Sequence, residues 1–192
     1  MSNVNVCTLA TSHVLASNFL LVSQPILQSR GSLTPMDSLP TLQVVLPSQV
    51  TSSQPELGLS FEVSIHNSAK KMVTLLNWGT PLDPLAGPLG VFEVRDTKSD
   101  SILPIDVIMI KRQLPPSADD LIEIGGSSSV DIIVQLPPLP ISAGHDYSIR
   151  ACGRYYAVWD SPRKDISKSQ LLELSGASSG EFTSNTAALN IE

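Results

Sequence analysis

The sequence predicts an all-β fold, an immunoglobulin-like antiparallel β-sandwich of about seven to nine strands with one short helix near the C terminus. The first observation behind this prediction is that 15 prolines and 11 glycines divide the 192 residues into short segments. The second is that these segments are rich in β-branched and aliphatic residues, as strands are. The third is composition, because 42% hydrophobic and 16% charged residues are typical of a globular domain rather than a disordered chain.

The first part of the domain provides five predicted strands. They lie at residues 41–46, 59–66, 72–78, 91–95 and 105–110. Residues 59–66 carry the clearest pattern, because apolar and polar side chains alternate strictly along them. Leu59, Phe61, Val63 and Ile65 fall on one face, so we expect this strand to have one buried and one wetter side.

The segment at residues 105–110 differs from the others because it is apolar almost throughout. Such a run is typical of a strand that is buried on both faces. Pro115 and Pro116 end it, since proline donates no backbone hydrogen bond to a sheet. On this interpretation Val107→Asp or Ile108→Asp would bury an unpaired carboxylate and unfold the domain.

The second part of the domain provides four more predicted strands and the helix. The strands lie at residues 121–124, 130–136, 147–152 and 187–191. Residues 165–174 instead carry apolar side chains at spacings that one face of a helix tolerates, and Ser161-Pro162 just before them suits a helix start. The helix is therefore expected late in the chain, before the last strand.

Residues 1–40 are predicted to be an appendage in front of the β-sandwich domain, which spans residues 41–192. Residues 4–27 are rich in apolar side chains interspersed with serine and asparagine, which favours an extended arm or an added strand over a long helix. Such an arm would cover the sandwich or pair with a neighbouring copy, which would give a homodimer through the arm. The apolar run at residues 14–22 is too short to span a bilayer, so no membrane span is expected.

Charge and cysteine content restrict the partners and the compartment. The formal charge of −6 and a pI near 5.0 argue against nucleic acid, since phosphate binding needs a basic face. Cys7 and Cys152 are the only cysteines, whereas small secreted domains usually carry more disulfides. We therefore expect a cytoplasmic protein, with secretion as the alternative, and leave open a bridge between the two cysteines.

The order of motifs along the domain resembles a known family. LLNWGTPLDPLAG, FEVRD and PIDVIMIKRQLPP follow one another, and RACGRYYAVW and GEFTSN come near the end. This order is similar to the non-catalytic β-sandwich domain of deuterolysin-like metalloendopeptidases, and closer to small stand-alone fungal proteins that lack the zinc domain. The resemblance implies the same sandwich fold and a non-catalytic role. Two departures are the 40-residue extension and Ile105, where the pattern has an aromatic residue.

Metalloprotease chemistry is not expected from this chain, and neither a metal nor a cofactor is predicted. Zinc proteases need two histidines one helical turn apart with a glutamate beside the first. His13, His66 and His145 are scattered along the sequence, and none is followed by glutamate. The chain also lacks the glycine-rich and nucleophile motifs of nucleotide-binding proteins and hydrolases.

The leading functional hypothesis is a non-catalytic binding or interaction module for a protein or a small apolar ligand. The candidate ligand-binding residues are aromatic or charged groups suited to stacking and to fork-shaped pairing with carboxylates: Trp78, Asp83, Arg112, Arg154 and Trp159. Asp83 lies in a rigid loop between prolines, where binding groups gather on sandwiches. The alternative interpretation of these residues is structural: the tryptophans pack, and Asp83 pairs with an arginine to fix its loop.

The second functional hypothesis is a small cofactor-free enzyme of fungal biosynthesis, a cyclase or isomerase. A sandwich can enclose an apolar pocket, and Asp83 or Asp106 beside Arg154 would move protons within it. A deep apolar pocket holding a carboxyl group with a shifted pKa would favour the enzyme. A filled core with shallow grooves would favour the binding module.

Overall fold

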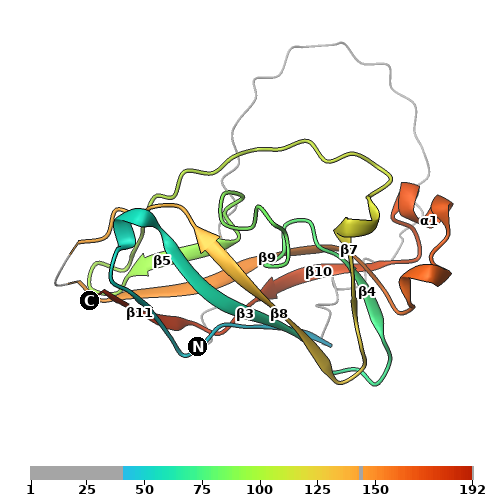
Figure 1. Cartoon of the computed structure of the whole chain (residues 1–192), viewed down its shortest axis with the longest axis horizontal. Helices are drawn as coiled ribbons and strands as arrows, with labels where there is room; N and C mark the ends of the chain where they lie inside the picture. The colour runs from blue at the N-terminus through green and yellow to red at the C-terminus, as the bar shows by residue number, and fades with distance from the viewer. Residues whose placement is uncertain (1–40, 143–144, 192) are drawn as a thin grey trace, which may run out of the picture. The chain divides into compact units, whose positions relative to one another are not determined.

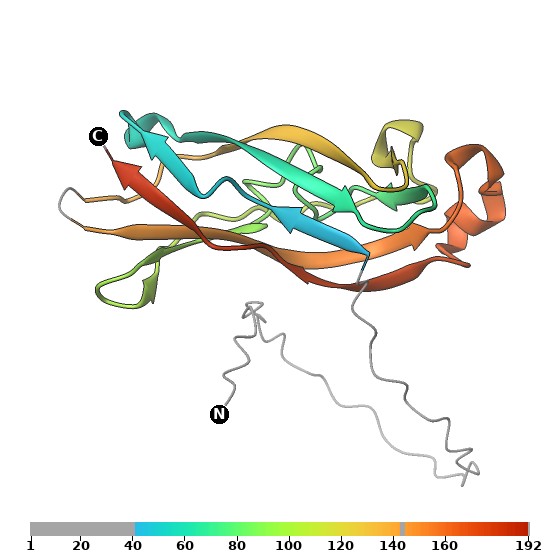
Figure 2. The same cartoon turned by 90° about the horizontal axis from the view of Figure 1, so that it is seen from below.

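The structure is a computed structural model that describes residues 41–142 and 145–191, which form two packed sheets (Figures 1 and 2). The strands in these ranges are β1 (Leu42–Val45), β2 (Gln49–Ser52), β3 (Leu59–Asn67), β4 (Val73–Leu76), β5 (Phe92–Asp96), β6 (Ser101–Ile102), β7 (Leu121–Ile124), β8 (Ser128–Leu136), β9 (Tyr147–Trp159), β10 (Ser178–Thr183) and β11 (Ala187–Ile191). The helices there are the 3-10 turns η1 (Pro55–Leu57), η2 (Ala118–Asp120) and η3 (Arg163–Asp165), and the α-helix α1 (Lys168–Glu173). The predicted arm at residues 1–40 lies outside the described residues.

Strand β9 organises the larger of the two sheets. The smaller sheet has three strands in the order β1–β3–β8, and the larger has eight, with β2–β11–β9–β4–β7 along its main path. β9 is 13 residues long and also pairs with β5 and β10. All pairings are antiparallel except the parallel one between β11 and β2. The predicted antiparallel sandwich is therefore confirmed, with eleven strands among the described residues rather than seven to nine.

The main core lies between the two sheets. The alternation predicted along residues 59–66 is present, because every second side chain of β3 is buried. From the other sheet, β5 and β9 contribute side chains such as Val94 and Ile149, which are fully buried. The rings of Phe61 on β3 and Phe92 on β5 meet edge to face with centroids 5.3 Å apart, a favourable geometry for an aromatic pair across the sheets.

A second, smaller hydrophobic cluster is built around the two tryptophans. Its buried members are Leu76, Trp78, Leu121, Ala157, Trp159 and Ile166, and Leu171 and Leu174 pack against it. The late helix was expected at residues 165–174 and is shorter, because Ser167 caps α1 through a reciprocal hydrogen-bond pair with Gln170. Leu174 follows in the left-handed conformation and ends the helix.

The prediction for residues 105–110 is wrong, since this segment belongs to no strand of the described ranges. Val107, Ile108, Met109 and Ile110 are 38–95% exposed, and Met109 is the most exposed of them. Only Ile105 is partly buried and packs on the main core. The sequence of such a short apolar run does not show whether its side chains are buried or exposed. Here the segment lies on the outside of the domain. Because Val107 and Ile108 are exposed, Val107→Asp and Ile108→Asp are no longer expected to unfold the domain.

Cys152 is buried on β9 and is engaged in a disulfide. The low cysteine count was taken to indicate a reducing compartment. The disulfide argues against that inference, because disulfides persist in oxidising compartments. Cys7 lies outside the described residues.

Candidate ligand-binding groove

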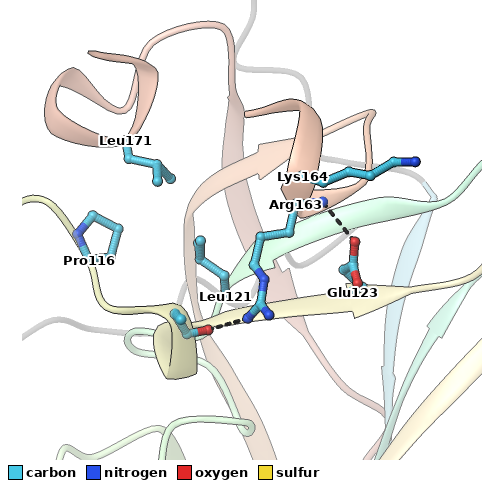
Figure 3. A pocket seen from close by; sticks show the side chains of 7 residues that line it. Pro116, Leu121, Glu123, Arg163, Lys164 and Leu171 are labelled. Carbon is cyan, nitrogen blue, oxygen red and sulfur yellow. Dashed lines mark hydrogen bonds between the residues drawn. The ribbon is translucent and has the colours of Figure 1, made fainter. Parts of the chain in front are cut away.

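A groove of about 500 Å³ lies at the end of the sandwich that carries α1 (Figure 3). It runs between η2 and β7 on one side and η3 and α1 on the other. The residues that line it are Pro116, Ala118, Leu121, Glu123, Arg163, Lys164 and Leu171. None of them is among the residues that the sequence suggested, because the groove is assembled from two segments, residues 116–123 and 163–171, that are distant in sequence.

The wall formed by η2 is held in place by the carboxylate of Asp120. Its Oδ2 accepts hydrogen bonds from the backbone N–H (2.8 Å) and the hydroxyl (2.6 Å) of Ser117. Its Oδ1 accepts the indole N–H of Trp78 at 2.9 Å. Burial opposes ionisation of Asp120, but these hydrogen bonds and the charge of Arg112 outweigh it and lower the pKa of that carboxyl. The wall is therefore fixed by an ionised aspartate.

Arg163 ties the opposite wall of the groove to the first. Its guanidinium Nη1 donates to the carbonyl oxygen of Ala118 at 2.6 Å, and its backbone N–H donates to Oε1 of Glu123 at 2.7 Å (Figure 3). Lys164 beside it is exposed, and its ammonium has no hydrogen bond or ion pair with any residue in the described ranges. Lys164 is thus the charged group of the groove that remains available to a ligand.

The floor of the groove is apolar and belongs to the tryptophan cluster. Leu121 is 5% exposed, and Leu171 is half-buried and packs on the same cluster. Trp78 and Trp159 are buried members of this cluster. The indole N–H of Trp159 donates to the carbonyl oxygen of Ser175 at 3.0 Å. Both indoles therefore support the floor from within the same cluster.

Three of the predicted binding residues do come together. Asp83 is buried, and its carboxylate accepts the backbone N–H groups of Gly79 and Leu85, each at 3.0 Å. Arg112 donates to the same carboxylate, and its guanidinium carbon lies 5.6 Å from the ring centroid of Trp78. This is the arrangement of the structural interpretation, in which Asp83 pairs with an arginine to fix its loop.

The remaining predicted residues lie elsewhere. Arg154 on β9 donates to the hydroxyl of Ser179 at 3.3 Å, opposite Glu181 of β10 in the register. Asp106 is exposed in the irregular segment before Arg112. No contact among the described residues joins Arg154 to Asp83 or Asp106, so these residues do not assemble the acid–base pair that the enzyme hypothesis needs.

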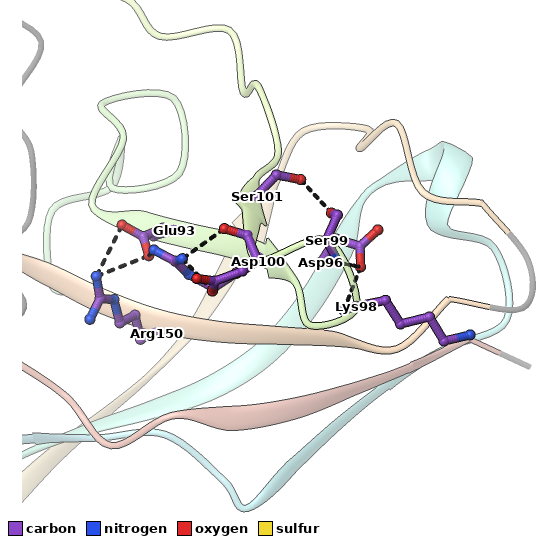
Figure 4. A network of polar contacts seen from close by, with 8 residues as sticks. Glu93, Asp96, Lys98, Ser99, Asp100, Ser101 and Arg150 are labelled. Carbon is purple, nitrogen blue, oxygen red and sulfur yellow. Dashed lines mark hydrogen bonds and ion pairs between the residues drawn. The ribbon is translucent and has the colours of Figure 1, made fainter.

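Two polar networks on β5 were missed from the sequence (Figure 4). Glu93 lies between the guanidinium groups of Arg95 (3.3 Å) and Arg150 (3.0 Å), and Arg95 also pairs with Asp100 at 2.7 Å. The alternation of FEVRD places Glu93 and Arg95 on one face of β5, and that spacing was the available signal. Nothing in the sequence indicated that Arg150 of β9 would lie beside them.

The second network joins the end of β5 to the connection before β9. Nδ1 of His145 lies 2.6 Å from Oδ2 of Asp96, and Oδ1 accepts the backbone N–H groups of Lys98 and Ser99. The hydrogen bond from His145, helped by the two backbone donors and opposed by burial, lowers the pKa of Asp96 to about 2. Asp96 is therefore an ionised carboxylate that fixes a turn, and it lies outside the groove.

The architecture defines an immunoglobulin-like β-sandwich. Residues 41–191 match the immunoglobulin-like domain family, and the chain belongs to that family. A protein of Arthroderma benhamiae, named as an uncharacterized secreted protein, is 50% identical over 129 residues. That match covers 65% of this chain and 65% of the relative's own length.

Two solved structures are similar at low sequence identity. One is WR4, a C. elegans MSP family member, with 9% identity and a TM-score of 0.34 over 79% of this chain and 98% of that one. The other is the ASH/PapD-like domain 7 of human CEP192, with 13% identity and a TM-score of 0.32 over 88% and 98%. Among the described residues, no helix is both long and apolar enough to cross a membrane.

Proposed function

We propose that the chain is a non-catalytic binding module that takes up an amphipathic ligand, with an apolar group and a carboxylate, in the groove beside α1. One observation supports this most directly: Lys164, whose ammonium is unpartnered among the described residues, lines the same groove as the apolar side chains of Leu121 and Leu171. A volume of about 500 Å³ is in the usual range for small-ligand sites, and it also admits one side chain of a protein partner. The rigid walls add pre-organisation, which favours affinity.

The groove offers charge and apolar contact but no pair of groups set for proton transfer. Glu123 accepts a backbone N–H and Arg163 donates to a carbonyl oxygen, so both are used in holding the walls. The main core is filled with side chains from both sheets. These features support the binding module over a cyclase or isomerase. The finer relationship to the accessory domain of deuterolysin-like metalloendopeptidases is part of this proposal and rests on the order of the motifs.

The proposal is tested with octanoate as the probe and octanol as its uncharged counterpart, by amide chemical-shift mapping on the full chain. Octanoate is expected to shift the amides of Leu121, Lys164 and Leu171 and to bind more tightly than octanol. Lys164→Gln is expected to weaken octanoate binding roughly twofold to fivefold, the range of an exposed ion pair, and to leave octanol binding unchanged.

The matched control is Lys71→Gln, which removes an exposed lysine in the connection between β3 and β4, outside the groove lining. It should bind octanoate as the wild type does. Equal weakening in both lysine variants, or shifts spread over the surface, would show that octanoate responds to net charge and would contradict the groove.

We also propose that the protein is secreted, which was the alternative from the sequence. The relative from Arthroderma benhamiae is named as secreted, and the disulfide of Cys152 suits an oxidising compartment. Iodoacetamide treatment of the unfolded, unreduced protein followed by peptide mass spectrometry is expected to leave Cys152 unmodified. Carbamidomethylated Cys152 before reduction would remove this support.

A further inference from the structure

The chain carries an exposed apolar strip, defined here as residues 106–112. It runs as an extended trace along one side of the domain, between β6 and η2 (Figure 1). Val107 is 60% exposed, Ile108 46% and Met109 95%. None of these residues lines the groove, so the strip is a separate surface from the proposed ligand site.

The backbone of the strip is hydrogen-bonded to the domain on one side and, among the described residues, has unpaired groups on the other. The N–H of Ile108 donates to the carbonyl oxygen of Pro88 at 2.9 Å, and no other backbone hydrogen bond of the strip is found within the described ranges. Successive peptide groups of an extended chain point to opposite sides. Because Ile108 faces the domain, Val107, Met109 and Lys111 direct their N–H and C=O groups outward. The strip is therefore an extended segment outside the sheets with backbone groups on its outer side that are unpaired within the described part of the chain, and a strand of another molecule can add to such groups.

We propose that a second copy of this chain pairs with the strip, antiparallel and about a two-fold axis at Met109. A symmetric antiparallel pair that joins the outward-facing residues has a fixed register. Met109 lies opposite Met109 of the second copy, and Val107 lies opposite Lys111. Ile108 then lies opposite Ile110 as an apolar pair at close spacing.

The charged residues at the two ends of the strip favour pairing with a second copy of the chain in the antiparallel direction. Asp106 is exposed at one end, and Lys111 and Arg112 lie at the other. In the antiparallel register Asp106 of one copy faces Arg112 of the other, twice by symmetry. The carboxylate of Asp83 and the ring of Trp78 already hold the Arg112 guanidinium in place. A parallel arrangement would bring like charges together, which destabilises cross-strand pairs.

The experiment uses the position on the two-fold axis, where each variant meets itself. The wild-type full chain is expected to shift from monomer to dimer in sedimentation as its concentration is raised toward about 1 mM. A high concentration is needed because short strand pairings are weak. Met109→Lys and Met109→Glu should each be monomeric, because like charges would face each other across the axis. An equimolar mixture of the two variants should form dimers again, because lysine then faces glutamate.

Two controls keep the test specific. Both variants should melt as the wild type does, since Met109 is 95% exposed. Leu57→Lys, at another exposed apolar residue in η1, should leave the dimer intact. A wild type that stays monomeric at every concentration would overturn the proposal. So would a dimer that persists in Met109→Lys, or a mixture of the charged variants that stays monomeric.

Discussion

An Ile149→Asp variant is expected to be unfolded under conditions in which the wild-type protein is fully folded. Ile149 is fully buried near the start of β9, opposite Val94 of β5 on one side and Ala187 of β11 on the other. The substitution removes a large apolar side chain and leaves an unpaired carboxylate in the core. These two effects together cost roughly 5 kcal/mol or more, which is comparable to the whole stability of a domain.

Val107→Asp is the matched control, because it makes the same kind of change at a residue that is 60% exposed. There the carboxylate stays in water, and the free energy of unfolding should change by no more than about 0.5 kcal/mol. Circular dichroism during thermal and urea unfolding measures both variants. A folded Ile149→Asp protein, or a Val107→Asp protein that melts far below the wild type, would mean that the core is misplaced.

This pair of variants marks what periodicity predicts and what it does not. Strict alternation along β3 predicted the buried face correctly, because a period of two relates each side chain to one side of a sheet. Apolar and polar residues do not alternate regularly in the run at residues 105–110, so its burial on both faces was inferred from hydropathy alone. The short strands β2 and β6 were missed, since Gln49–Ser52 and Ser101–Ile102 carry too few apolar residues for a pattern.

Sequence reasoning identified functional candidates only where the residue types are chemically distinctive. Trp78, Asp83 and Arg112 were singled out as residue types, and they do meet. The groove was not predicted, because Leu121, Lys164 and Leu171 are ordinary residues that only the packing of η2, η3 and α1 brings together. A single sequence contains no signal for contacts of this range.

Asn67→Asp is the second variant expected to have a large effect, although it changes one atom group and hardly any volume. Asn67 is fully buried at the end of β3. Its Nδ2 donates to the carbonyl oxygens of Lys71 (2.8 Å), Gly125 (3.1 Å) and Ile124 (3.2 Å), and its Oδ1 accepts the N–H of Ala69 at 3.0 Å. The amide therefore joins the β3–β4 turn to the β7–β8 turn. A carboxylate would place negative charge against three carbonyl oxygens, at a cost of roughly 3 kcal/mol or more.

The pH dependence separates this repulsion from a simple loss of packing. Burial beside carbonyl oxygens should raise the pKa of the new carboxyl group in the folded state above its unfolded value of about 4. Its penalty relative to the wild type is then small below pH of about 4, where both states hold the proton, and grows as the pH rises and the unfolded state ionises first. Urea unfolding of both proteins across this range measures the difference. Asn190→Asp, at an exposed position of β11, should show no such trend. A penalty for Asn67→Asp that is the same at every pH would mean that the amide acts through its shape and not through its donated hydrogen bonds.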